Sequence, residues 1–163
     1  MRQIIAICGV KNSGKTTLIE KLVASMSKEE KKVAVIKHDG HDFACDIPGT
    51  DSYRMTEAGA YGTAVYSKYR MFVHKVGTGE EERELFEMFP EADIIFVEGL
   101  KDSSYPKIEI VRSGISDHPV SNPEGRFLVA TDIERPKFTD KTADLNNIES
   151  IRAAIEQRFI KMQ

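Results

Sequence analysis

A phosphate-binding loop is indicated near the start of the chain by nine consecutive residues: Gly9, Val10, Lys11, Asn12, Ser13, Gly14, Lys15, Thr16 and Thr17. The two glycines let the backbone turn so that successive N–H groups converge on phosphate oxygens. Lys15 is expected to meet the β- and γ-phosphates, and the Thr16 hydroxyl is expected to bind Mg²⁺. The run therefore predicts a site for a nucleoside triphosphate.

A magnesium site of this kind needs a second group, which is usually an acid at the end of a neighbouring strand. Two acids satisfy that condition, because Asp39 follows the apolar run 33–36 and Glu98 ends the apolar run 94–97. Asp93 is acidic too, but it begins its strand and so lies at the wrong edge of the sheet. The predicted magnesium ligands are therefore Thr16, Asp39 and Glu98.

A polar segment, 37–52, follows the second apolar run and carries several groups that could bind a ligand: His38, His41, Asp42, Cys45, Asp46 and Asp51. Three interpretations stay open. The segment is a loop that binds a substrate or partner or responds to the γ-phosphate, an ordinary polar loop, or a metal site. The spacing fits no standard zinc pattern, so the zinc interpretation ranks last.

Asp132 follows the apolar run 127–130 and is a candidate for base recognition, since a carboxylate can accept from the adjacent N–H donors of guanine. The residues around it lack the full signature of common GTPases, so capping a turn is the alternative role. Lys101 and Arg112 are candidates for contact with an anionic substrate or with acids of a partner, against the alternative of ordinary solvated charges.

The elements that must position these residues follow from hydrophobic periodicity. Buried strands are expected at 2–8, 33–36 and 94–97, and further strands at 108–111, where the pattern alternates, and at 127–130. Helices are expected from Lys15, over 80–89 and near the end of the chain. A short helix capped by Thr50 or Asp51 should precede a hairpin formed by 63–66 and 71–76. This pattern predicts an α/β, three-layer P-loop NTPase fold in one domain, 1–163, with a mostly parallel sheet, helices on both faces and a small hairpin extension.

Composition narrows the partners of the protein. The chain has 163 residues, 40% of them hydrophobic and 30% charged, with a net charge of -3. No global positive field favours nucleic acid or an anionic membrane, and no apolar stretch reaches the ~18 residues of a membrane span. The first apolar run is expected to be a strand rather than a signal peptide, and the two cysteines form no secreted-type framework. A cytoplasmic protein without nucleic-acid or membrane partners is predicted.

Six segments in order, GVKNSGKTTL, VIKHDGHDF, DIPGTDSYR, EAGA, VEGLK and PKIEIVR, resemble the molybdopterin-guanine dinucleotide biosynthesis protein B family over about residues 1–135. The resemblance implies a cytoplasmic, dimeric protein that binds GTP and Mg²⁺ and hydrolyses GTP weakly. It also implies an accessory role beside the guanylyltransferase that joins GMP to molybdopterin, together with other proteins of that pathway. The chain departs from the family pattern at Gly40, Ala44 and Thr50, where histidine, aspartate and lysine are common.

Two other functions remain open from the sequence. A freestanding small-molecule kinase or ATP-dependent ligase would share the same core, but it would need cationic clamps and a lid, and no arginine-rich lid segment is present. A nucleotide-gated regulator would have a similar sequence. The hairpin at 63–76 offers an unpaired strand edge to a second copy of the chain, which agrees with the dimer implied by the resemblance.

Overall fold

A computed structural model describes residues 2–40, 43–77 and 82–160. The chain forms two compact units, one made of 1–38 with 84–163 and the other of 39–83. We describe each unit by itself. The single domain expected from the sequence stays a prediction.

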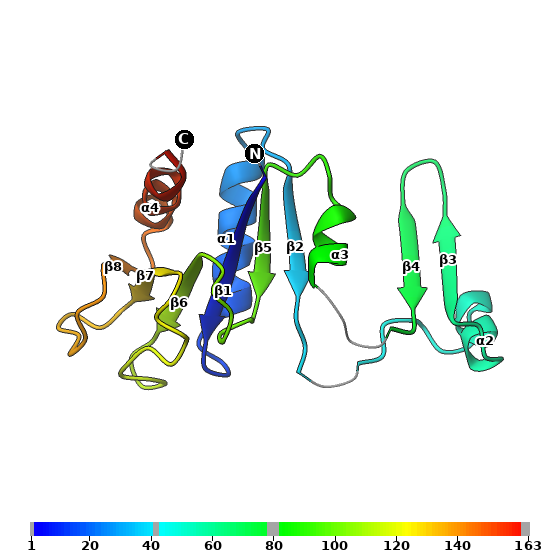
Figure 1. Ribbon diagram of the computed structural model, residues 1–163, viewed down its shortest axis with the longest axis horizontal. Coiled ribbons are helices and arrows are strands. Elements are labelled where there is room, and N and C mark those ends of the chain that lie inside the picture. Colours follow the sequence, from blue (N-terminus) through cyan, green and yellow to red (C-terminus); the bar gives the residue numbers. More distant parts are fainter. Residues whose placement is uncertain (1, 41–42, 78–81, 161–163) are drawn as a thin grey trace. The chain divides into compact units, whose positions relative to one another are not determined.

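The first unit contains a six-stranded sheet in which every neighbouring pair of strands is parallel (Figure 1). Its spatial order is β2-β5-β1-β6-β7-β8. The strands are β1 (Gln3–Gly9), β2 (Val33–Lys37), β5 (Ile94–Glu98), β6 (Lys107–Val111), β7 (Arg126–Thr131) and β8 (Thr142–Asp144). The first strand is central, so the loop that follows it is flanked by the ends of β5 and β6.

Helices cover both faces of this sheet. Helix α1 (Lys15–Ser27) and helix α4 (Ile148–Ile160) pack on one face, where Leu22 and Ile151 join Phe96 of β5 in the main core. Helix α3 (Glu82–Glu87) packs on the other face through Phe86, which meets the side chains of Ile95 and Val97. The predicted α/β fold with a parallel sheet between helices is therefore confirmed.

The strand predicted at 108–111 is present as β6, but its alternating pattern does not mark an exposed face, because all five of its residues are buried. The Lys107 ammonium donates to the carbonyls of Ser103, Asn122 and Glu124. The loops that precede and follow β6 thus cover this face where no helix does, and a buried charge is acceptable there because backbone oxygens satisfy it.

Glu109 is the second buried charge of β6. Its carboxylate accepts from the amides of Val120 and Ser121 and from the Ser121 hydroxyl, at 2.5, 3.0 and 2.6 Å. Arg126 lies 3.4 Å away and pairs with Asp140 at 2.8 Å. The charged residues of the PKIEIVR segment therefore fasten the 112–125 loop to the sheet.

Two further details differ from expectation. Strand β8 was not predicted, because three residues of mixed polarity carry no periodic signal. Helix α3 ends at Glu87 rather than Phe89, and the amides of Met88 and Phe89 form tighter turns before Pro90. The part of the predicted helix at 80–81 lies outside the described residues.

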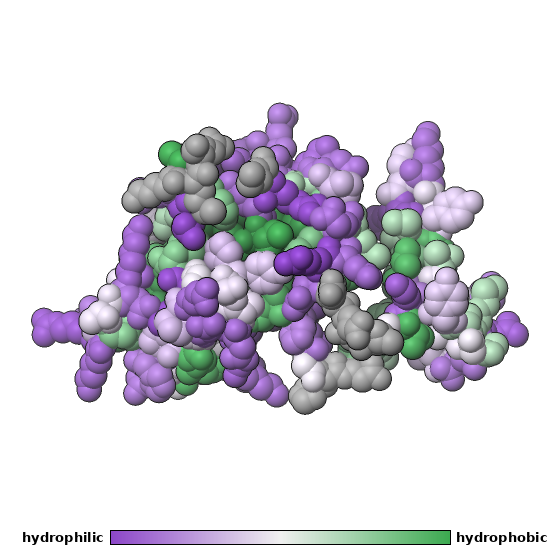
Figure 2. Space-filling model, in the orientation of Figure 1, coloured by the Kyte–Doolittle hydropathy of each residue, from purple (hydrophilic) through white to green (hydrophobic). Residues whose placement is uncertain are grey.

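The second unit contains helix α2 (Asp51–Glu57) and the antiparallel hairpin β3 (Gly62–Tyr66) and β4 (Met71–Lys75), as the sequence predicted. Thr50 caps α2, since its hydroxyl accepts from the Tyr53 amide at 3.4 Å. No described residue of this unit is buried, and Figure 2 shows apolar side chains on its visible surface. The described part of this unit therefore has no core of its own.

Among the described residues, no helix is both long enough and apolar enough to span a membrane.

Candidate functional site

The loop between β1 and α1 has a backbone that only glycine allows at its two ends. Gly9 has φ 141°, and a Cβ there would lie 2.7 Å from the Ser13 Oγ and 2.8 Å from the Ile110 carbonyl oxygen. Gly14 has φ 100° and forms the N-cap of α1 without a side-chain hydrogen bond. The amides of the first turn are thus left for a ligand, at the positive end of a 13-residue helix.

Two polar side chains of the loop fit an anion. Ser13 is completely buried, and its Oγ has no hydrogen-bond partner among the described residues. The Lys15 ammonium folds over the loop and donates to the carbonyls of Gly9 and Val10, at 3.2 and 2.9 Å. A polyphosphate would give both groups charged acceptors, which make stronger hydrogen bonds than carbonyls do.

A pair of oxygen ligands lies on the β5 side of the loop. The Thr16 hydroxyl donates to the Glu98 Oε2 at 3.0 Å. This contact brings together two of the three residues predicted to bind magnesium. A hydroxyl and a carboxylate beside a phosphate cradle fit Mg²⁺, which takes few protein ligands and completes its shell with phosphate oxygens and water. The residues present therefore fit both the nucleotide and the ion.

The end of β5 also brings His38 to this side. Its amide donates to the Glu98 carbonyl at 3.0 Å. A Cβ at Gly99, which has φ 116°, would lie 3.3 Å from the Cβ of His38. Glycine is favoured there because a φ of 116° strains any other residue, and His38 also packs closely on this backbone.

Cys8 lies beneath the same turn. Its thiol donates to the Gly99 carbonyl at 2.9 Å, and the residue is only 1% exposed. Burial raises the pKa of Cys8 to about 12. The group is therefore a neutral donor that holds the turn rather than a nucleophile.

The other side of the loop carries Asp132 and Arg112. The Arg112 Nε lies 3.8 Å from the Asp132 Oδ2, and the Ser113 amide donates to Oδ1 at 2.7 Å. Asp132 thus has two partners within the chain. These contacts give it a positioning role, which is close to the turn-capping alternative stated from the sequence. Its contact with a guanine base stays a prediction.

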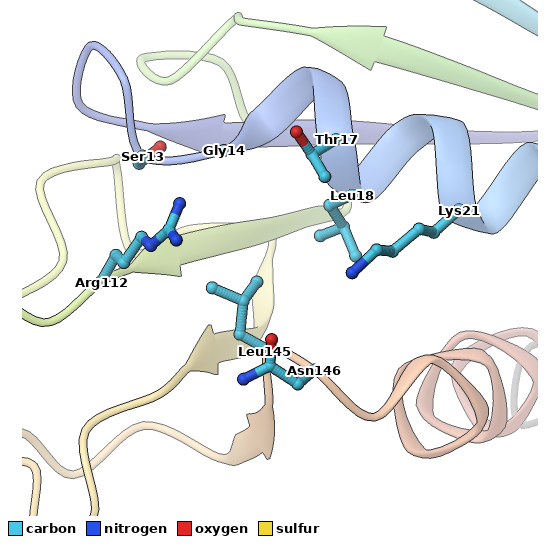
Figure 3. A pocket seen from close by; sticks show the side chains of 8 residues that line it. All are labelled: Ser13, Gly14, Thr17, Leu18, Lys21, Arg112, Leu145 and Asn146. Carbon is cyan, nitrogen blue, oxygen red and sulfur yellow. The ribbon is translucent and has the colours of Figure 1, made fainter.

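A pocket opens beside Gly14 on this side, between α1, the end of β6 and the segment after β8 (Figure 3). Figure 3 shows Arg112 reaching towards Ser13 and Gly14, and Lys21 extending towards Leu145 and Asn146. The loop predicted from the sequence supplies Ser13, Gly14 and Thr17. No local pattern in the sequence marks Lys21, Leu145 or Asn146 as pocket residues, and only the unpredicted β8 brings the last two here.

The other predicted site residues have different positions. Asn12 has φ 63° and, like Lys11, is exposed within the loop. Lys101 is exposed in the turn after β5. Asp39 belongs to the second unit, so its contact with magnesium stays a prediction.

The polar segment has a local structural role at Asp46. Hydrogen bonds from Ser52, the Ile47 amide and Thr50 hold the pKa of Asp46 below its usual value, and they shape the turn before α2. Asp51 is exposed in the first turn of that helix. His41 and Asp42 lie outside the described residues. Within the described residues, no three histidine, cysteine or acidic side chains form a metal-binding group.

Comparison with known proteins gives a consistent set of similarities. The family described as MobB, molybdopterin guanine dinucleotide synthesis protein B, matches residues 4–132. The molybdopterin-guanine dinucleotide biosynthesis adapter protein of Escherichia coli (strain K12) is 31% identical, over 93% of this chain and 90% of that protein. The adapter protein of the same description from Haemophilus influenzae is 32% identical, over 94% and 87%.

Solved structures show the same fold. The crystal structure of Bacillus subtilis MobB superposes with a TM-score of 0.72 at 25% identity, covering 93% of this chain and 97% of that one.

Proposed function

Because the chain belongs to the MobB family of molybdopterin guanine dinucleotide synthesis proteins, we propose that its phosphate loop binds GTP with Mg²⁺ in the service of that synthesis. The protein is an adapter of molybdopterin-guanine dinucleotide biosynthesis, within the formation of the molybdenum cofactor. The resemblance found in the sequence is therefore confirmed. What the adapter binds, and which proteins it serves, belong to the proposal.

The observation that carries the nucleotide proposal is the contact between Thr16 and Glu98 beside the Gly9–Gly14 cradle. It joins a hydroxyl at the start of α1 to a carboxylate at the end of β5, at 3.0 Å. Such a pair can hold Mg²⁺ against the β- and γ-phosphates while Lys15 neutralises the remaining charge. The base is proposed to be guanine on the strength of the family resemblance.

The guanylyltransferase of the pathway is the proposed partner, and it would join GMP to molybdopterin while the adapter holds nucleotide or stabilises the complex. Hydrolysis of GTP by the adapter alone is expected to be slow. Lys101 and the 37–52 segment are the proposed contacts for the partner or its substrate. A cytoplasmic location without nucleic-acid or membrane partners is part of the same proposal.

The test replaces Lys15 with alanine and measures GTP and ATP binding by calorimetry in the presence of Mg²⁺. The native protein should prefer GTP, and the variant should lose at least tenfold in affinity because the ammonium group no longer meets the phosphates. Lys21→Ala is a poor control because Lys21 lines the pocket. Lys28→Ala, at the exposed C-cap of α1, is used instead.

A second measurement adds the purified guanylyltransferase and follows formation of the dinucleotide with and without this protein. Stimulation that disappears with Lys15→Ala supports the adapter role. Undiminished binding of GTP by Lys15→Ala would contradict the nucleotide proposal. Phosphorylation of a small acceptor without any partner would favour the kinase alternative instead.

A homodimer is proposed from the second unit. Cross-strand pairs place Ala64 with Val73 and Tyr66 with Met71 on one face of the hairpin. The opposite face carries Thr63 and His74, which contact Thr56 of α2.

The first of these faces carries apolar side chains that no described element of the unit covers: Tyr66, Met71 and Val73 are 84%, 75% and 46% exposed. Burial of this face against a second copy would give the unit the apolar contacts that it lacks.

A further inference from the structure

The two sides of the phosphate loop have different chemistry. Sheet order places β5 on one side of β1 and β6 on the other, so Glu98 and Arg112 flank the loop from opposite directions. The β5 side offers the oxygen ligands of Thr16 and Glu98. The β6 side offers cations and an amide, which are groups that bind anions and polar rings rather than metals.

The pocket on the β6 side is built for more than phosphate. It is lined by Ser13, Gly14, Thr17, Leu18, Lys21, Arg112, Leu145 and Asn146 (Figure 3). None of these described residues is acidic, and two are cationic. The Ser13 hydroxyl is fully buried and has no hydrogen-bond partner among the described residues, which is a costly state that a hydrogen-bonding ligand would relieve.

Arg112 is held beside the loop by the fold. Its amide donates to the Ser116 hydroxyl at 3.3 Å, and its carbonyl accepts from the amides of Ile115 and Ser116. Asp132 lies 3.8 Å from the guanidinium, whose Nη1 is 3.4 Å from the point that a Cβ on Gly14 would occupy. The guanidinium thus lies at the N-terminus of α1, where an anion is already favoured.

Asn146 is held at the far end of the pocket. Its backbone amide donates to the Asp144 Oδ1 at 2.9 Å, and the next residue, Asn147, caps α4 through Ser150 at 3.0 Å. The side-chain amide of Asn146 makes no hydrogen bond to the described residues, and Leu145 beside it is buried. An amide offers both donors and an acceptor, as the edge of guanine does.

We propose that this pocket holds the nucleoside end of the ligand, with Arg112 on the α-phosphate and Asn146 on the base. The nucleotide then crosses the loop with its γ-phosphate towards Glu98 and its base towards β8. Asp132 acts as a positioning residue that aims Arg112. This inference rests on the proposed nucleotide binding and specifies the residues that recognise the ligand.

Calorimetry with GTP, GDP and inorganic tripolyphosphate tests the orientation in Arg112→Ala. GTP and GDP share the α-phosphate, so the variant should lose about tenfold in affinity for both and by the same factor. Loss for GTP alone would place Arg112 on the γ-phosphate and overturn the inference, as would no loss for either. Arg112→Lys should recover part of the affinity, because it restores charge without the planar fork.

Asn146→Ala tests the base contact in the same experiment. GTP affinity should fall about tenfold, whereas the affinities for ATP and tripolyphosphate should not change. Equal losses for all three ligands, or no loss for GTP, would contradict the role of Asn146 in base recognition.

Two controls separate a loss of ligand contacts from general destabilisation and from the loss of an unrelated surface charge. Asn147→Ala removes the cap of α4 and should lower the melting temperature without changing affinity for any ligand. Arg70→Ala removes an exposed arginine from the hairpin turn and should change neither. If Lys15→Ala loses binding and Arg112→Ala and Asn146→Ala do not, the proposed nucleotide site still holds. Only the placement of the base would then be refuted.

Discussion

The hydroxyl of Thr16 and the carboxylate of Glu98 meet although 82 residues separate them in the chain. Parallel strands explain the contact, because the ends of β1 and β5 reach the same edge of the sheet. Each group is weak as an isolated magnesium ligand. Together, beside a phosphate cradle, they offer the ion two oxygens in fixed positions.

Glu98→Gln should make GTP binding insensitive to magnesium. The amide keeps the shape of the side chain but removes the negative charge that attracts the ion. We expect affinity measured with Mg²⁺ to fall about tenfold, and affinity measured with a chelator to stay the same or to rise. Calorimetry under both conditions gives the comparison.

Glu20→Gln is the matched control, since Glu20 is exposed on α1. It should behave as the native protein under both conditions. If Glu98→Gln binds GTP as tightly as the native protein with magnesium, and loses affinity by the same factor when the chelator is added, Glu98 is not a ligand.

Cys8 should resist thiol reagents in the folded protein at pH 8. Its pKa of about 12 leaves almost no thiolate, whereas Cys45 is exposed. One thiol per chain should react in the native state and two in denaturant, and Cys45→Ser should remove the native reaction. A second native thiol that reacts rapidly would show that the turn under Gly99 opens.

The same burial links stability to pH. The folded state keeps the Cys8 proton up to about pH 12, whereas the unfolded thiol loses it near 9.0. The unfolded state therefore binds fewer protons between these values, and the contribution of Cys8 to stability falls as pH rises through this window.

Local chemistry was predictable from the sequence, whereas most contacts between distant segments were not. The loop residues from Gly9 to Thr16 are consecutive, so their spacing alone indicates phosphate binding. Glu98 could be proposed because it ends an apolar run. The contact of Arg112 with Asp132 and the position of Asn146 depend on strand order, which no short segment encodes.

At the scale of elements, strand β6 shows how an alternating pattern can mislead. Lys107 and Glu109 occupy positions that normally face solvent, yet both are at most 1% exposed. The loops around β6 supply the carbonyls and amides that these charges need. Alternation predicted the strand correctly, but it could not predict that loops would cover the polar face.

Lys107→Met should destabilise the protein by about 3 kcal/mol, because three carbonyls lose their donor while the volume of the side chain is nearly kept. Denaturant unfolding measures the change. Lys141→Met, on an exposed residue near β8, should cost little. A stability of Lys107→Met equal to that of the native protein would show that water or loop rearrangement satisfies the carbonyls.

Strand β8 shows the limit of periodicity for short elements. Its three residues pair with Val129, Ala130 and Thr131 of β7, and this pairing, rather than a preference of its own, makes it a strand. Without β8, the segment that carries Leu145 and Asn146 had no predicted place. The missing strand and the missed pocket residues are therefore one failure of prediction.

At the scale of the whole molecule, the second unit should depend on a partner for its stability. Val73→Glu places a charge on the uncovered face of the hairpin and should convert a dimer into a monomer without changing GTP affinity. Sedimentation at micromolar concentration measures the mass, and calorimetry measures the affinity.

Lys68→Glu changes an exposed charge in the hairpin turn, outside the paired strands, and is the control. It should sediment as the native protein does. A native protein that sediments only as an 18.3 kDa species would contradict the dimer proposal.

The close fit of Gly9 against Ser13 and the Ile110 carbonyl has a kinetic consequence. The core of the sheet already fixes the curvature of the loop there, so capture of a ligand requires little ordering of its backbone. The association rate of the ligand should then be governed by diffusion and by the charges of the surface. This rate should fall as ionic strength rises. The residence time of the ligand would therefore determine its affinity. Variants of this chain should differ mainly in that residence time.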